Sequence, residues 1–244
     1  MHSEIEEKLL VENPLEITDW RSPLADVGFH YTQQEHGAHM LKALSRGIRW
    51  VQHNALLGYQ QELAVPGIMF TTGSESPYIP PAPFCYDPTR NAILIDIDTL
   101  FQTANTFLAH EIVTFRNTPH GEPFFHGSVG HFFTLQGTHE TEHSRWDQFE
   151  GVPLQTSLRP EHVSSAEYDA QPHELAARRA EVGAAKHFGM PEETIALPQR
   201  DIDAALLFLQ ERADYQELLR QNHWTNSRFV KWFTSRFGGK SEDE

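Results

Sequence analysis

Residues 137–149 read GTHETEHSRWDQF, and residues 139–143 within this stretch form an HExxH pentad. On an α-helix, residues four apart lie on one face, about 6 Å apart along the axis. The imidazoles of His139 and His143 can therefore reach a single ion. Zinc in proteins takes histidine, cysteine and carboxylate ligands in a tetrahedral arrangement. We predict that both histidines bind one zinc ion.

Glu140 directly follows the first histidine, so it is expected to point toward the coordination position that the protein ligands leave open. A carboxylate there can take a proton from a zinc-bound water molecule and pass it to a leaving amine. We therefore predict Glu140 as the general base and acid. The chain contains 15 histidines among 244 residues, so the pentad also has an alternative interpretation, two exposed histidines on a polar helix face.

A catalytic zinc site needs a third protein ligand. The downstream candidates are Glu150, Glu161, Glu167, Glu174 and Glu181. Pro172 predicts the start of a helix, which places Glu174 in its first turn. Ala177, one turn later, would let this helix approach the HExxH helix closely. We predict Glu174 as the third ligand, because Glu181 lies about 10 Å further along the same helix face.

Three residues of the same region are candidates for supporting roles. Tyr168 could stabilise an oxyanion, although a tyrosine at a helix start is also a common packing residue. Glu181 or Asp169 could accept a hydrogen bond from a ligand histidine and so fix the orientation of its ring.

The pentad followed by Tyr-x-x-x-Pro-x-Glu-x-x-Ala-x-x-x-Glu at residues 168–181 resembles the zincin metallopeptidases that use a glutamate third ligand. The layout of residues 37–188 is similar to that of the ImmA/IrrE-like and ArdC-like proteins of bacteria and phages. This resemblance implies that His139, His143 and Glu174 bind one Zn²⁺ and that Glu140 is the general base. It also implies that the substrate is a protein or peptide, and that the chain is a bacterial effector or a mobile-element protein.

The remaining sequence favours a zincin-like α+β fold, mainly helical with a small β-sheet. Apolar residues at helical spacing and Pro- or Gly-rich breaks define the expected elements. We predict helices at 1–12, 37–62, 99–114, 128–149, 173–188, 201–222 and 225–237, and strands at 67–72 and 92–96. Residues 86–91 are predicted as a turn and 117–127 as a loop. We expect residues 1–35 to be an N-terminal helix and an irregular lead-in, and 36–240 to be a single metallopeptidase domain.

Composition restricts the partners and the compartment. Lys and Arg number 19 against 34 Asp and Glu, a formal net charge of −15, which repels nucleic-acid phosphates and anionic membranes. No apolar run approaches the ~18 residues of a membrane span. The N-terminus is acidic where a secretory signal is basic. We expect a cytoplasmic protein that binds neither nucleic acid nor membrane. Export without a signal peptide stays open, and so does the choice between a monomer and an oligomer.

Two other functions compete with a zinc peptidase. One is a zincin-like binding or regulatory module whose metal site is weak or inactive. The other is a di-iron carboxylate helical protein, since Glu140 and His143 form one Glu-x-x-His pair. Such di-iron sites need a second Glu-x-x-His pair on another helix, and the sequence contains none.

Overall fold

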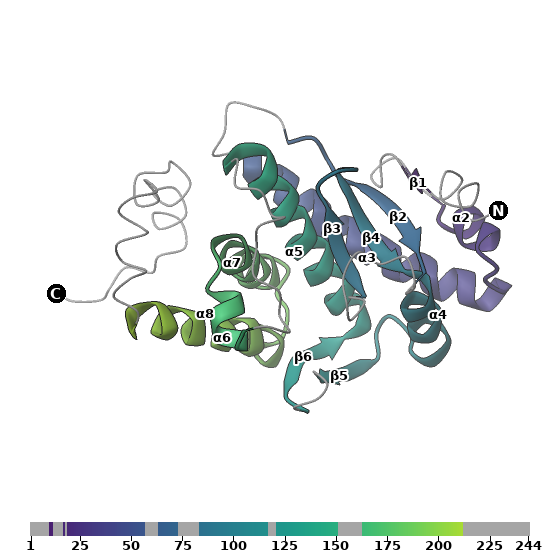
Figure 1. Cartoon of the computed structure of the whole chain (residues 1–244). Helices are drawn as coiled ribbons and strands as arrows, with labels where there is room; N and C mark the ends of the chain where they lie inside the picture. Colours follow the sequence, from purple (N-terminus) through teal and green to yellow (C-terminus); the bar gives the residue numbers. More distant parts are fainter. Residues whose placement is uncertain are drawn as a thin grey trace.

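The computed structural model of this chain describes residues 10–11, 17, 19–56, 63–72, 83–116, 121–150 and 163–211. Over these residues the fold is α+β, with mostly helices, one four-stranded sheet and one two-stranded hairpin (Figure 1). The elements are β1 (Leu10–Val11), α2 (Arg21–Asp26), α3 (Tyr31–Leu56), β2 (Gly67–Thr71), β3 (Phe84–Asp87), β4 (Ala92–Asp96), α4 (Ile97–Thr106), β5 (Ile112–Arg116), β6 (Pro123–Ser128), α5 (Val129–Glu150), α6 (Ser165–Asp169), α7 (Pro172–His187) and α8 (Glu192–Glu211). Among the helices of these ranges, none is long and apolar enough to cross a membrane.

The four-stranded sheet has the order β1-β2-β4-β3, so β3 lies at one edge within the described residues. Strands β2 and β4 pair in parallel, and β3 runs antiparallel to β4. The strands predicted at 67–72 and 92–96 are confirmed to within one residue. Strand β3 was not predicted. Tyr86 and Asp87 belong to this strand, although they were assigned to the predicted turn. Asn91 closes this hairpin with a positive φ of 45°, a conformation that asparagine tolerates.

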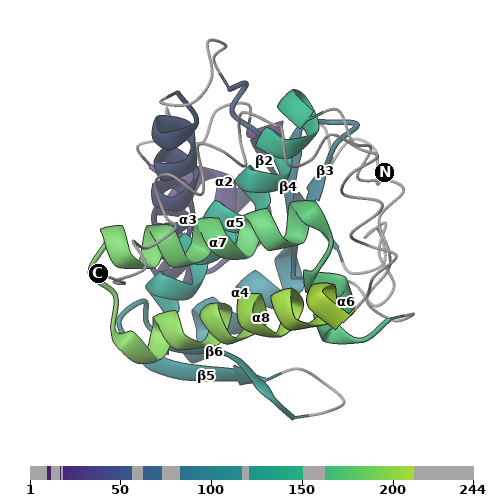
Figure 2. The same cartoon turned by 90° about the vertical axis from the view of Figure 1, so that its left-hand side faces the viewer.

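Helix α5 carries the pentad and is the central helix of the fold. It packs against α3 and β3 on one side and α7 on the other. Figure 2 shows α7 and α8 running side by side, with α7 in front of α5. The predicted helix at 128–149 is confirmed as Val129–Glu150. All five residues of the pentad are buried, so the alternative of two histidines on an exposed polar face is wrong.

Two glycines bring α3 and α5 into contact at the level of their backbones. A Cβ atom on Gly47 would lie 2.0 Å from the carbonyl oxygen of Thr134, and one on Gly137 would lie 2.2 Å from that of Leu44. Both distances are far below van der Waals contact, and the atoms met are backbone atoms that cannot rotate away. The pentad helix is therefore fixed against α3 at a spacing that only glycine permits.

Replacing Gly47 by alanine is expected to lower the free energy of unfolding by about 3 kcal/mol or more, since overpacking against rigid backbone is strongly destabilising. This is opposite to the gain of roughly 1 kcal/mol that Gly→Ala brings in an unhindered helix. Gly37→Ala in the same helix is the control, because its Cβ would meet side-chain atoms and no backbone, the nearest being the end of the Leu24 side chain at 2.8 Å. Urea unfolding of both variants measures the difference. Equal stability of the two would contradict the close approach.

The N-terminal predictions are partly wrong. Leu10 and Val11 form a strand that pairs antiparallel with β2, where a helix over 1–12 was expected. The rest of that helix lies outside the described residues. The lead-in at 13–35 is not irregular, because it contains α2 and the first turn of α3, which begins at Tyr31. Trp20 and Leu24 of this segment are fully buried, so burial against α3 orders it.

The predicted helix at 99–114 and the predicted loop at 117–127 are also wrong in part. Helix α4 ends at Thr106, and β5 and β6 form an antiparallel hairpin. Burial along β5 alternates at first, with Val113 buried between the exposed Ile112 and Thr114, which is the period of a strand. The hairpin packs on the start of α5, where the ring of Phe132 lies 4.6 Å from that of Phe115.

The C-terminal part agrees better with prediction. Helix α7 begins at Pro172 as expected and ends at His187. Helix α8 begins at Glu192 and includes Pro198, so it starts nine residues before the predicted helix at 201–222. The end of that helix, the predicted helix at 225–237, and residues 73–82 of the Pro-rich segment lie outside the described residues.

Candidate metal centre

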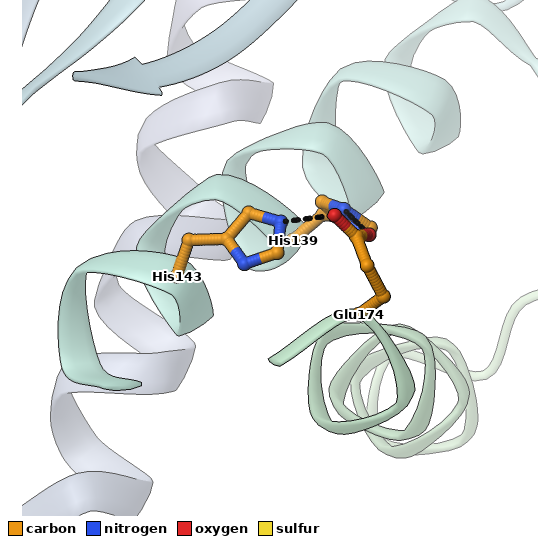
Figure 3. Close-up of side chains that lie close together, drawn as sticks. All are labelled: His139, His143 and Glu174. Carbon is orange, nitrogen blue, oxygen red and sulfur yellow. Dashed lines mark ion pairs between the residues drawn. The ribbon is translucent and has the colours of Figure 1, made fainter. Parts of the chain in front are cut away.

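The structure brings His139, His143 and Glu174 together in a buried group. Figure 3 shows the two histidines projecting from α5 toward Glu174 on α7. His139 Nε2 lies 3.3 Å from Glu174 Oε2, and His143 Nε2 lies 3.5 Å from Glu174 Oε1. One ligand atom from each residue lies within 4.8 Å of the other two. This group could hold one metal ion.

The hydrogen bonding of His139 supports this interpretation. Its Nδ1 lies 3.0 Å from Glu181 Oε1, and a carboxylate can only accept, so Nδ1 carries the hydrogen. In the neutral ring Nε2 then presents a lone pair to Glu174 Oε2, which has no hydrogen-bond partner among the described residues. Two acceptors that face each other repel unless a proton or a cation lies between them. The donor set fits a divalent cation.

The charges at the site show the same need for a cation. Burial lowers the pKa of His139, but the carboxylates of Glu181 and Glu174 outweigh this effect and raise it to about 10. Burial would raise the pKa of Glu174, yet His143 and His139 hold it well below its usual range. A metal ion bound by this group would supply the positive charge that a proton on His139 otherwise provides, and would displace that proton.

Glu181 is placed by a buried ionic chain. Arg178 Nη1 lies 3.2 Å from Glu181 Oε2, and Arg178 Nε lies 3.2 Å from Asp169 Oδ1. The burial of Glu181 would raise its pKa, but Arg178 and His139 lower it below the usual value. A charged Glu181 can therefore orient the His139 ring. Asp169 acts one step further away, through Arg178, and does not contact a candidate ligand.

Glu140 is 6% exposed and lies on α5 beside the edge strand β3. Burial raises the pKa of Glu140 to about 7, although His139 and a hydrogen bond with the Tyr86 backbone oppose the shift. A carboxylate whose pKa lies near neutrality is suited to accepting a proton and giving it back.

Tyr168 and His173 lie beside Glu174 Oε1, the oxygen that His143 Nε2 also approaches. The Tyr168 hydroxyl donates a hydrogen bond of 2.6 Å to Glu174 Oε1, so here it holds the carboxylate of a candidate ligand. His173 Nε2 lies 3.6 Å from the same oxygen. The α7 helix start supplies both His173 and Glu174, because Pro172 sets its first turn.

The two variable positions of the pentad have structural roles. The Thr141 hydroxyl donates to the carbonyl oxygen of Gly137 at 2.6 Å. Glu142 is buried and pairs with the buried Arg145 three residues later. Burial raises the pKa of Glu142, and Arg145 opposes this shift. Two polar side chains at these positions are thus compatible with a buried helix.

Two further residues of this region were not predicted from the sequence. Arg178 and His173 are now seen to contact Glu181 and Glu174, respectively. Each had a signal in the sequence, since Arg178 is three residues from Glu181 on one helix face and His173 is adjacent to Glu174. His126 and His131 do not belong to the metal-ligating group found among the described residues, and His120 lies outside those residues.

Comparisons of the chain with protein-family models, with curated proteins and with solved structures found no match.

Proposed function

We propose that this protein is a zinc metallopeptidase that hydrolyses peptide bonds of a protein substrate. The observation that carries the proposal is the buried convergence of His139, His143 and Glu174, with the buried Glu140 beside the first histidine on the same helix. Two imidazoles and one carboxylate are a common ligand set of catalytic zinc sites, which keep a further position open. A zinc ion held there would polarise a substrate carbonyl and lower the pKa of water.

Glu140, Glu181 and Tyr168 have separate roles in the proposed reaction. Glu140 accepts a proton as the water oxygen forms its bond to the carbonyl carbon, and it returns this proton to the nitrogen as the carbon–nitrogen bond breaks. Glu181 holds the His139 ring through Nδ1, and Tyr168 holds Glu174 through its hydroxyl. These contacts keep the ligands preorganised, which limits the reorganisation needed during the reaction.

Strand β3 suggests how an extended substrate is aligned. It pairs with β4 and lies at the sheet edge within the described residues. The hydrogen bond between the Tyr86 backbone and Glu140 indicates that the outer side of β3 faces the site. A peptide that adds to this edge by backbone hydrogen bonding would carry its scissile bond past Glu140.

Metal analysis and a hydrolysis assay test the proposal together. We expect the purified full chain to contain one zinc per chain, with His139 and His143 nitrogens about 2.0–2.1 Å from the ion. We expect it to cleave an unstructured protein such as casein, to stop after chelation, and to recover when zinc is restored. Cleavage that persists after complete removal of metal would contradict the proposal.

Zinc is also expected to stabilise the fold. At a free concentration about 100 times its Kd, a ligand that binds only the folded state adds about 2.7 kcal/mol, or roughly 5–10 °C in Tm for a chain of this size. Chelation should remove this increment, as measured by thermal denaturation. The same titration on Glu174→Gln is the control and should show almost no shift. An equal shift in both proteins would place the zinc elsewhere.

The two competing functions predict different metal contents. A di-iron protein would contain two iron ions, but the metal-ligating group found among the described residues holds a single carboxylate. A binding or regulatory module with a degenerate site would contain little metal or none. The complete ligand set and the buried Glu140 favour the peptidase over both.

A further inference from the structure

His173 is a buried histidine that the proposed hydrolysis has not yet used. Its residue is 6% exposed, and it precedes Glu174 in the first turn of α7. Its Nε2 lies 3.6 Å from Glu174 Oε1, and its ring centroid lies 5.4 Å from that of His143. His173 therefore lies beside two of the three candidate ligands.

The other polar groups around the ligands already have hydrogen-bond partners. Tyr168 donates to Glu174, and Glu181 accepts from His139. Arg178 pairs with Glu181 and with Asp169. The His173 ring differs, because it makes no hydrogen bond to another residue in the described part of the chain. The His173 nitrogens are not among the fully buried polar atoms without a partner, so a partner bound at the site can reach them.

The position of His173 indicates which partner this is. His173 does not belong to the group whose ligand atoms all lie within 4.8 Å of one another. A metal ligand would belong to that group, whereas a residue that contacts another molecule bound at the metal would lie just outside it. In either protonation state the imidazole has at least one N–H to donate.

We propose that His173 donates a hydrogen bond to the carbonyl oxygen of the peptide bond that is cleaved, at the coordination position that the three ligands leave open. This inference rests on the proposed peptidase function. Negative charge grows on that oxygen as water adds to the carbonyl carbon, and a preorganised N–H donor stabilises it. Tyr168, the residue that the sequence suggested for this role, donates to Glu174 instead.

The test uses the full chain loaded with Co²⁺, whose visible absorption reports on groups that bind to the metal. The probe is acetohydroxamate, a small chelator with a carbonyl oxygen. We expect His173→Ala and His173→Leu to bind it about tenfold more weakly than the wild type, since a hydrogen bond to a charged group is lost. The leucine variant preserves most of the buried volume if the alanine variant fails to fold. His173→Gln can donate through its amide and should recover most of the affinity.

His187→Ala is the matched control, because His187 is exposed in the last turn of the same helix. Its affinity should equal that of the wild type. An unchanged affinity in His173→Ala would overturn the proposal. A tighter affinity would also overturn it, because it would mean that His173 is itself a ligand that the probe displaces. X-ray absorption of the zinc protein gives an independent count, in which two imidazoles support the proposal and three contradict it.

These measurements separate the role of His173 from the proposed function. Casein cleavage together with an unchanged affinity for acetohydroxamate would refute the role of His173 and leave the peptidase proposal standing. A tenfold loss of affinity without any cleavage would refute the peptide substrate while upholding the hydrogen bond from His173. Failure of the full chain to bind Co²⁺ or Zn²⁺ would refute both.

Discussion

Glu174→Ala is expected to lower zinc affinity by orders of magnitude. Glu174 supplies the carboxylate that lies 3.3 Å from His139 Nε2 and 3.5 Å from His143 Nε2. Its removal leaves two neutral nitrogens and no negative charge in the ligand set. The loss should exceed the roughly 10–100-fold that follows when a partner of a ligand is removed. Zinc affinity is measured by competition with a chromophoric chelator.

Two other glutamates provide graded controls for this experiment. Glu181→Gln removes the charged partner of His139 Nδ1, so its loss is expected within the roughly 10–100-fold range. Glu167 is in α6 and outside the metal-ligating group, so Glu167→Ala should keep wild-type affinity. Metal retained by Glu174→Ala but lost by Glu181→Ala would show that the third ligand lies two helical turns further along α7.

Glu140→Gln is expected to retain zinc but to lose peptide hydrolysis by about 10²–10⁴-fold in kcat. Glutamine preserves the shape of the buried side chain, but its amide cannot accept the proton that the water releases. The measurement pairs metal content with initial rates of casein cleavage. This separation distinguishes a catalytic residue from a ligand, since loss of a ligand removes both the metal and the activity.

Glu142→Gln is the matched control for this variant, because Glu142 is a buried glutamate two residues later on the same helix. It pairs with Arg145, so its loss should lower the stability of the fold. Below the unfolding temperature its zinc content and its rate should stay close to those of the wild type. Unchanged turnover by Glu140→Gln would refute the role of Glu140 as the general base.

The sequence by itself determined the local features of the site. The spacing of four residues puts His139 and His143 on one face of any helix, and the Gly- and Pro-rich segment before Ser128 limits where that helix can begin. Pro172 likewise fixed the start of α7 and placed Glu174 in its first turn. Signals of this kind depend on helix geometry and on proline, which act over a few residues and need no tertiary context.

Strands were harder to predict, because their stability depends on partners distant in sequence. Residues 110–114 have apolar content that also fits a helix, but β5 gains its backbone hydrogen bonds from β6. The pairing buries Val113 and Phe125 against the core. Leu10 and Val11 became a strand through β2, more than 50 residues away. Tertiary context overrides local propensity in such segments.

Only the tertiary structure decided which polar residues meet the candidate ligands. In the folded chain, Glu181 accepts a hydrogen bond from His139, and Tyr168 donates one to Glu174. Arg178 pairs with both Glu181 and Asp169. The tertiary structure also placed His173 beside Glu174. These contacts join α5 to α7, whose approach depends on the packing of buried helices and not on any spacing along the chain. The pKa of about 7 for Glu140 has the same origin, because burial and neighbouring charges exist only after the chain has folded.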